Sequence, residues 1–289
     1  MTIRNYKTDH ITLLLISILF GVLVLQTSVV AKEDEIIDIV FDLDWTLVCE
    51  LEDGSHAHGN ILDISRKKYR IANWAEEMLV LLASRPNVRL SFYSGGDQIR
   101  NLEILKEIIL PEKNISVFDL AYKILSKDDM DEVSQEKTLR FSQRYKKNAA
   151  KINSNLNNVI IIDDVSDFTL ASQKQNLLWL GPTFNHYDSY ELVKKARKLD
   201  PTNKYIPKNQ AQWKLNQDRL LVIYGILDEA LEKTQKNGTP FVQNVQTIAK
   251  KYKLDHTAYN SEITKVIKKY KLMLKSSGSL LQACLKALN

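Results

Sequence analysis

The stretch IIDIVFDLDWTLV, residues 36–48, joins an apolar run to two acidic residues. Residues 36–41 are nearly all apolar, which is typical of a central strand in a parallel sheet that is covered on both faces. Asp42 and Asp44 follow directly, two residues apart. Two carboxylates at one strand end repel each other, and burial raises the cost of ionising both. A divalent cation would offset this cost, so the stretch predicts a metal site.

Further strands and helices alternate along the chain after this stretch. Strands are predicted at 88–93, within 115–125, at 159–162 and within 176–184, and helices at 73–85, 97–109, 134–152 and 189–199. This alternation predicts an α/β fold with a parallel sheet and right-handed crossovers. Asn73 and Asp97 are the candidate N-caps of the first two helices. Residues 50–71 predict a short excursion such as a β-hairpin.

Polar side chains follow three of the predicted strands. They are Asp42 and Asp44, Ser94 with Gly95 and Gly96, and Asp163 with Asp164. Sites in parallel α/β sheets form at the carboxyl ends of the strands, so we expect these groups to meet at one edge. An acidic site without histidine or cysteine offers only oxygen ligands, which suits Mg²⁺ better than Zn²⁺.

The same groups suit the transfer of a phosphoryl group. A carboxylate can attack phosphorus and form an aspartyl-phosphate. A second carboxyl group can protonate the leaving alcohol and then activate water. A hydroxyl group and backbone N–H groups next to glycine can hold the phosphate oxygens, and a lysine can balance the negative charge.

These motifs resemble those of the haloacid dehalogenase (HAD) superfamily. DLDWT, residues 42–46, matches the D-x-D-x-T signature of the superfamily. RLSFYSGG at 89–96 resembles its second motif, and VIIIDD at 159–164 resembles its fourth. The resemblance covers roughly residues 36–190 and implies a Rossmann-like sheet flanked by helices. Because dehalogenases of the superfamily lack the second aspartate and its ion pumps carry threonine there, the resemblance favours a phosphatase.

The third motif is a single lysine, and its placement resembles one branch of the superfamily. In the phosphatases of the RNA polymerase C-terminal domain and the NLI-interacting-factor-like proteins, this lysine lies some sixteen residues before the first aspartate of the fourth motif. Lys147 stands sixteen residues before Asp163, and Lys151 is the second candidate. Trp45 departs from this branch, which commonly has glutamate at that position, and we expect Trp45 to shape substrate access.

The resemblance implies a role for each residue of the site. The implied catalytic residues are Asp42, Asp44 and Lys147, the substrate-binding residues are Thr46, Ser94 and Gly95, and the metal ligands are Asp42, Asp44, Asp163 and Asp164. Asp42 would be the nucleophile, and Asp44 the general acid and base with its backbone carbonyl on Mg²⁺. Thr46 would orient Asp42, and Lys147 would stabilise the charge on Asp42 and phosphate.

The spacing of the motifs bears on the substrate. About forty residues separate Thr46 from the second strand, which leaves room for a flap but not for a folded cap domain. An open site favours a phosphorylated protein, with phosphotyrosine or phosphoserine/threonine, over a small metabolite. Two alternatives remain open: a catalytically silent relative that serves as a membrane-tethered docking or receptor protein, and a nonspecific secreted acid phosphatase.

The N-terminus predicts a targeting or anchoring segment. Residues 11–31 carry no charge, are long enough to span a bilayer, and follow the basic residues Arg4 and Lys7. Ala31 precedes the polar sequence KEDE, as at a signal-peptide cleavage site. We therefore expect the protein to be exported, with the segment cleaved, or to be anchored in a membrane by it.

The two parts of the chain differ in charge. Residues 1–193 have a formal balance of −7, whereas residues 194–289 have a balance of +12. We predict a signal or anchor at 1–31, a HAD-like domain at 32–200 and a basic helical region at 201–289. The basic helices are expected to pack in a small bundle. The alternative is that they attach to an anionic membrane or to an acidic partner. No motif or aromatic pattern indicates nucleic-acid binding.

Five further residues have chemistry that the predicted site does not use. His56 and His58 are expected in a surface loop, with substrate contact as the alternative. His186 is expected to play no part in the site, with a place near the site as the alternative. Cys49 and Cys284 are far apart in sequence and are expected to be free thiols.

Overall fold

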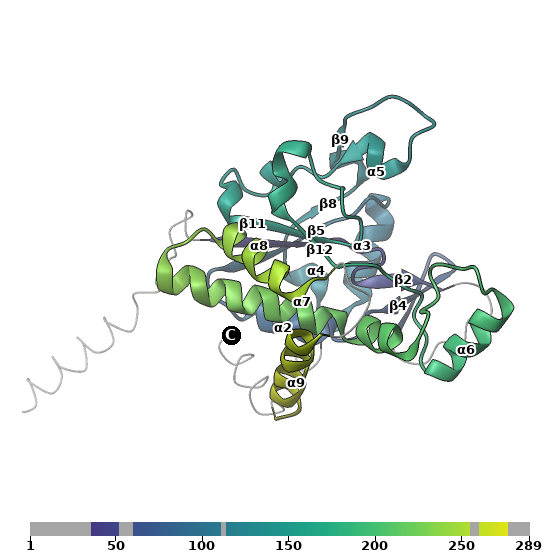
Figure 1. The fold of residues 1–289 in the computed structure, drawn as a ribbon. Coiled ribbons are helices and arrows are strands. Elements are labelled where there is room, and N and C mark those ends of the chain that lie inside the picture. The colour runs from purple at the N-terminus through teal and green to yellow at the C-terminus, as the bar shows by residue number, and fades with distance from the viewer. Residues whose placement is uncertain (1–35, 52–59, 111–113, 255–259, 277–289) are drawn as a thin grey trace, which may run out of the picture. The chain divides into compact units, whose positions relative to one another are not determined.

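The structure is a computed structural model that describes residues 36–51, 60–110, 114–254 and 260–276 (Figure 1). The predicted signal or anchor at 11–31 lies outside these residues, as do His56, His58 and Cys284. Within the described ranges, no helix combines the length and the apolar character that a membrane span requires.

The centre of the fold is a five-stranded sheet with strand order β12-β11-β1-β5-β8. Its strands are β1 (Ile37–Phe41), β5 (Val88–Tyr93), β8 (Ala121–Leu125), β11 (Val159–Asp163) and β12 (Leu177–Trp179). All neighbouring strands in it are parallel. Helices connect and flank these strands, so the chain has the α/β, Rossmann-like fold that the sequence predicts. β1 is the central strand, as its continuous burial requires.

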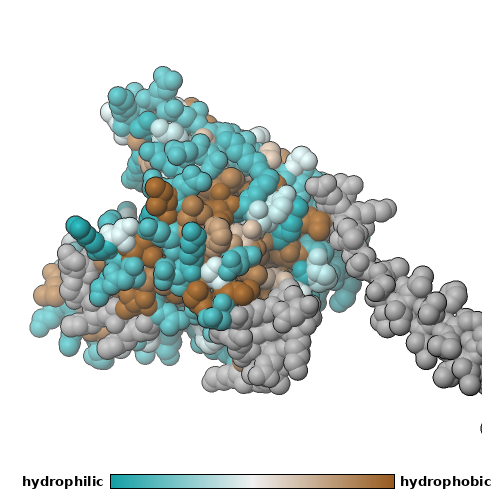
Figure 2. Space-filling view, turned by 180° about the vertical axis from the view of Figure 1, so that it is seen from behind, coloured by the Kyte–Doolittle hydropathy of each residue, from teal (hydrophilic) through white to brown (hydrophobic). Residues whose placement is uncertain are grey.

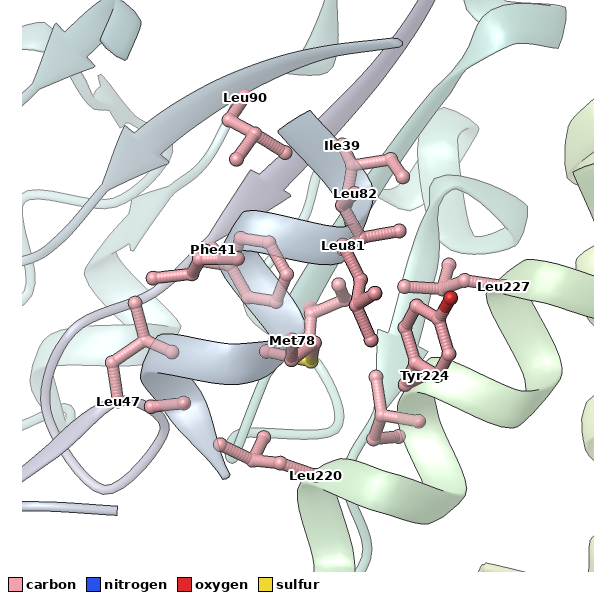
Figure 3. Packing of buried hydrophobic residues seen from close by; sticks show 14 of the residues in the cluster. Ile39, Phe41, Leu47, Met78, Leu81, Leu82, Leu90, Leu220, Tyr224 and Leu227 are labelled. Atoms are coloured by element: carbon pink, nitrogen blue, oxygen red, sulfur yellow. The ribbon is translucent and has the colours of Figure 1, made fainter. Parts of the chain in front are cut away.

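Side chains of β1 alternate between two hydrophobic clusters on the two faces of the sheet. Ile39 and Phe41 belong to the larger cluster, and Val40 belongs to the smaller one. Figure 3 shows Ile39 and Phe41 packed against Met78 and other side chains of α2 (Ala75–Ala83), with Tyr224 of α7 (Gln210–Asn237) beside them. The larger cluster therefore joins the sheet to the C-terminal helices.

The C-terminal helices pack on one another, and the middle one of them also contacts the sheet (Figure 1). They are α7, α8 (Phe241–Tyr252) and α9 (Ser261–Ser276). A Cβ atom on Gly225 of α7 would lie 2.6 Å from Val266 Cγ1, so α9 approaches α7 closely because this position is glycine. Two aspartates of α7, Asp218 and Asp228, bind Lys271 and Tyr270 of α9. The apolar face of α9 thus packs in a bundle, and the boundary at residue 200 stays a prediction.

The connections carry smaller elements. They are β2 (Val48–Glu50), β3 (Ile61–Ile64) and β4 (Lys67–Ile71) in one sheet, α3 (Gln98–Glu107), β6 (Ile109–Leu110) with β7 (Ile115–Ser116), α4 (Val117–Leu120), β9 (Asp131–Glu132) with β10 (Tyr145–Lys146), α5 (Phe141–Arg144) and α6 (Tyr190–Leu199). β3 and β4 form the expected hairpin, which turns at Ser65 and Arg66, both with positive φ. Asp97 caps α3 through bonds from Ile99 and Arg100 N–H, as predicted.

Two local predictions are wrong. Residues 134–152, predicted as one helix, contain only the short helix α5 and a 3₁₀ turn, with β10 between them. Residues 145–147 are held extended because β10 pairs with β9 and Lys147 N–H donates to Phe168 O, 2.8 Å, so tertiary pairing overrides helix propensity. Asn73 does not cap α2, because the helix begins at Ala75 and Trp74 stands at the N-cap position; the Asn73 amide group donates to Gln217 of α7.

The face seen from behind has apolar residues near its middle, with polar residues around them (Figure 2). Large hydrophobic side chains with exposed surface include Phe118 of α4 and Tyr122 of β8. Cations lie over both rings: Lys106 Nζ is 5.2 Å from the centroid of Phe118, and Arg89 Cζ is 3.7 Å from that of Tyr122. These rings are therefore partly covered by the chain itself.

Candidate active site

The carboxyl ends of β1, β5 and β11 lie side by side. Phe41 of β1 is in register with Phe92 of β5 and with Ile162 of β11, and Asp42 N–H donates to Ile162 O, 3.0 Å. The polar residues that follow these strands consequently share one edge of the sheet, as the sequence predicts. Asp42, Ser94 and Asp163 are all buried there.

Lys147 enters this edge from the segment that was expected to be helical. Its Nζ donates to Asp42 Oδ1 at 2.7 Å and to Asp163 Oδ2 at 2.6 Å, and its side chain has no exposed surface. Burial opposes the charge on Lys147, but Asp163 and Asp42 outweigh it, so the pKa of Lys147 is raised. Lys147 is therefore a buried ammonium group shared by two carboxylates. Lys151, the second candidate, binds Asp131 and the carbonyl of Asp129 instead.

Asp42, Asp163 and Asp164 form an acidic cluster. One carboxylate oxygen from each lies within 4.8 Å of the others. Burial raises the pKa of Asp42 well above its usual value, although Lys147 lowers it, and burial together with Asp163 raises the pKa of Asp164 to about 7. Three carboxylates with one ammonium group are short of positive charge. This donor set of oxygens fits a small hard cation such as Mg²⁺.

Asp44 lies beside this cluster with a different partner. Both of its carboxylate oxygens accept hydrogen bonds from the guanidinium of Arg100, one of them at 2.8 Å, and Ser94 Oγ donates to it at 3.3 Å. Burial opposes the charge on Arg100, but its bonds to Asp44 outweigh this and raise its pKa. The side chain of Asp44 is therefore turned toward Arg100 and is separate from the three-aspartate cluster.

The remaining predicted residues also lie at this edge. Gly95 lines the cleft described below, and Gly96 N–H donates to Ser94 Oγ, 3.2 Å, which orients the hydroxyl group. Thr46 is buried, and its Oγ1 makes no hydrogen bond to any residue that the structure describes. The structure therefore does not show the orienting bond from Thr46 to Asp42 that the resemblance implies.

A cleft of about 570 Å³ opens over the cluster. Asp42, Asp44 and Asp164 lie in its floor or walls, and aromatic side chains make up much of the rest: Trp45, Tyr69, Phe141 and Phe168. This volume is in the range of sites that hold a small molecule or a large side chain. β4 and the turn at Ser65 form one wall, so the excursion after β1 acts as the predicted flap.

Sequence reasoning missed two arginines near the site. Arg100 lies in the first turn of α3, three residues after the N-cap Asp97, and its guanidinium contacts Asp44. That spacing was a usable signal. Arg219 of α7 is buried and donates to Gly181 O, 3.1 Å, and burial lowers its pKa to about 10 although Asp164 opposes the shift. No local pattern marks Arg219, because tertiary packing of the C-terminal helix places it.

His186 is near the charged residues Arg70, Arg219 and Asp188 and is not among the residues that line the cleft. Burial, Arg70 and Arg219 lower the pKa of His186 to about 4. Its Nδ1 is enclosed and has no hydrogen-bond partner among the described residues. Cys49 is a buried free thiol whose pKa burial raises to about 12. Both groups are therefore neutral at pH 7 and suit a structural role.

We expect acid to destabilise the fold through His186. The unfolded chain binds a proton near pH 6.5 and the folded chain only near pH 4, so stability falls as pH drops from about 7 to 4. The loss is on the order of 3 kcal/mol. Urea unfolding at several pH values would show a shallower decline in His186→Phe than in the unchanged protein. Parallel declines would contradict this assignment.

Comparisons with known proteins complete this description. No family model and no curated protein matches the chain. Among solved structures, the chain is similar to Fcp1, an essential RNA polymerase II CTD phosphatase, with 14% identity and a TM-score of 0.41. It is also similar to a variant of the fission yeast phosphatase Fcp1 bound to beryllium fluoride, with 15% identity and a TM-score of 0.41. In each case 74% of this chain and 71% of the other are covered.

Proposed function

We propose that the protein is a Mg²⁺-dependent phosphatase that forms an aspartyl-phosphate on Asp42 and acts on phosphorylated proteins. The observation that carries this proposal is the buried Lys147 bridge between Asp42 and Asp163, next to Asp164. A lysine without exposed surface is costly unless its charge is used, and a phosphoryl group on Asp42 would bring negative charge to it.

The proposed reaction has two steps. An oxygen of Asp42 attacks phosphorus, the ester P–O bond breaks, and Asp44, in its protonated form, gives its proton to the departing oxygen. Water then attacks the phosphorus of the aspartyl-phosphate, Asp44 takes a proton from that water, and inorganic phosphate leaves as Asp42 is restored. Ser94 Oγ and the N–H groups of the glycine loop would hold the phosphate oxygens.

Asp42, Asp163 and Asp164 are the side chains that would hold Mg²⁺, with the Asp44 carbonyl as the further ligand that the resemblance implies. Bound Mg²⁺ would supply positive charge to the phosphate oxygens and to the nucleophile. Lys147 keeps Asp42 oriented through its 2.7 Å bond and prevents Asp42 and Asp163 from repelling each other.

Release of inorganic phosphate from phosphopeptides tests the proposal. Purified residues 32–289 are incubated with a set of phosphotyrosine, phosphoserine and phosphothreonine peptides, with Mg²⁺ or with EDTA. We expect turnover of at least one peptide class that EDTA abolishes and added Mg²⁺ restores. Absence of turnover from every peptide and from p-nitrophenyl phosphate would favour a silent docking protein instead.

We expect Mg²⁺ to stabilise the folded protein in the absence of substrate. A ligand that binds only the folded state at a concentration of 100 Kd adds about 2.7 kcal/mol to the free energy of unfolding. Thermal unfolding should therefore shift upward with Mg²⁺, and Asp164→Asn should reduce the shift because it removes one ligand. Asp167→Asn, close in sequence but outside the cluster, serves as the matched control. An equal shift in both variants would place the ion elsewhere.

The location of the protein remains a proposal from sequence. Residues 11–31 support export or membrane anchoring, and the lysines of the C-terminal region support contact with an anionic membrane surface. Detection of the tagged protein in membrane, soluble and extracellular fractions, with and without residues 1–31, tests the first of these.

A further inference from the structure

The walls of the cleft contain aromatic side chains that binding of a phosphate group does not require. Trp45 and Phe141 both line it, and they come from segments almost a hundred residues apart. The acidic cluster, Ser94 and Lys147 are enough to hold phosphate and metal. The aromatic side chains above them therefore need another explanation, either as packing or as contacts for the rest of the substrate.

Trp45 has an unusual backbone conformation within the turn that follows Asp44. Its φ is 59°, in the left-handed region that bulky residues rarely adopt, and its N–H donates to Val48 O, 2.7 Å. This conformation directs the residue after Asp44 into the cleft lining.

The ring of Trp45 is supported by a second aromatic ring, that of Tyr205. It packs on Tyr205, with ring centroids 5.8 Å apart, and Tyr205 is itself 45% exposed. The loop that carries Tyr205 is fixed by Arg197, whose guanidinium donates to the carbonyls of Pro201, Asn203, Ile206 and Pro207. Trp45 and Tyr205 thus form a fixed aromatic surface at the cleft.

Phe141 supplies a second aromatic surface, next to the phosphate-binding loop. Its ring lies 4.9 Å from that of Tyr145 and meets Phe168 edge-on at 5.9 Å, yet Phe141 is 38% exposed. A Cβ atom on Gly95 would lie 2.8 Å from Phe141 Cε1, so glycine beside Ser94 makes room for this ring. An apolar ring attached to a phosphate held at Ser94 would contact it.

We infer that the cleft selects aromatic phosphate esters, so that the proposed phosphatase acts on phosphotyrosine in preference to phosphoserine or phosphothreonine. The inference rests on the proposed function and adds the substrate class. A phosphoserine side chain has no ring to contact Trp45 and Phe141, which both line the cleft, whereas phosphotyrosine brings a ring into it. Two aromatic contacts amount to about a ten-fold difference in affinity.

Binding to a protein that cannot turn the substrate over tests the inference without the bias of a better leaving group. The Asp42→Asn protein is titrated by calorimetry in the presence of Mg²⁺. Three versions of one peptide are compared, which carry phosphotyrosine, phosphoserine or phosphothreonine at the same position. We expect the phosphotyrosine peptide to bind at least about ten-fold more tightly. Equal affinities would overturn the inference.

Two further substitutions in the Asp42→Asn protein test which aromatic rings cause the preference for phosphotyrosine, and a third serves as control. Trp45→Asn removes the ring with a residue that tolerates positive φ, and Phe141→Ala removes the other ring without a backbone constraint. Each should lower the preference several-fold, whereas Phe118→Ala, an exposed ring outside the cleft lining, should not. A preference that survives both substitutions would also overturn the inference.

Failure of the aromatic selectivity can be distinguished from failure of the proposed phosphatase reaction. Turnover of phosphoserine and phosphotyrosine peptides at equal kcat/KM would leave a phosphatase but remove the aromatic selectivity. If no peptide is hydrolysed, the proposed reaction fails, and the binding comparison still decides whether the walls recognise an aromatic ring.

Discussion

Asp42→Asn should reduce phosphate release by at least about 10³-fold while leaving the protein folded. The amide cannot attack phosphorus, so the first step of the proposed reaction is lost. Burial raises the pKa of Asp42 well above its usual value, which means that its negative charge is unfavourable in the folded state. Removing that charge should therefore raise the free energy of unfolding measured without metal. Steady-state kinetics and urea unfolding measure the two effects.

Asp38→Asn is the matched control for this change. Asp38 lies on β1, the strand that Asp42 follows, is fully buried, and accepts two hydrogen bonds from Arg89 at 2.9 and 2.8 Å, away from the cleft. We expect the opposite pattern: turnover within a few-fold of the unchanged protein, and a loss of about 2 kcal/mol because Arg89 loses its charged partner. Equal turnover by Asp42→Asn and Asp38→Asn would show that Asp42 is not the nucleophile.

The composition of β1 explains why the first motif could be predicted from the sequence. β1 is apolar at every position except Asp38, so its place at the centre of a parallel sheet follows from composition. The carboxyl ends of parallel strands meet by geometry, which brings Asp42, Ser94 and Asp163 together without knowledge of any contact. Elements with strong periodicity, such as α3 with its Asp97 cap, were predicted for the same reason.

Long-range contacts account for what the sequence could not reveal. The lysine-rich segment 134–152 has helix-forming composition, yet β9 and the Phe168 backbone hold its residues 145–147 extended, and this conformation lets Lys147 reach Asp42. The pairing of Asp44 with Arg100 depends on the orientation of α3, and the stacking of Trp45 on Tyr205 depends on a loop that returns after 160 residues of chain. Local propensity carries no information on such contacts.

Lys147→Met should destabilise the protein more than any other single change at the site. It leaves two carboxylates, Asp42 and Asp163, buried with no cation between them, and breaking a buried ion pair from one side costs about 3–5 kcal/mol. Turnover should also fall to background, because no group balances the charge of a phosphoryl group on Asp42. Urea unfolding in EDTA at pH 7.5 measures the loss of stability.

Two further measurements distinguish this cause from a simple packing defect. Without Lys147 the pKa of Asp42 rises further, so the folded state takes up a proton, and stability should fall as pH rises from about 4 through that pKa. Mg²⁺ should restore part of the lost stability, because it supplies the missing positive charge. Lys151→Met removes a lysine whose ion pair with Asp131 is partly exposed and should cost less than about 1 kcal/mol, independent of Mg²⁺. If the two lysine variants lost equal stability, Lys147 could not be the ammonium group that holds the acidic cluster together.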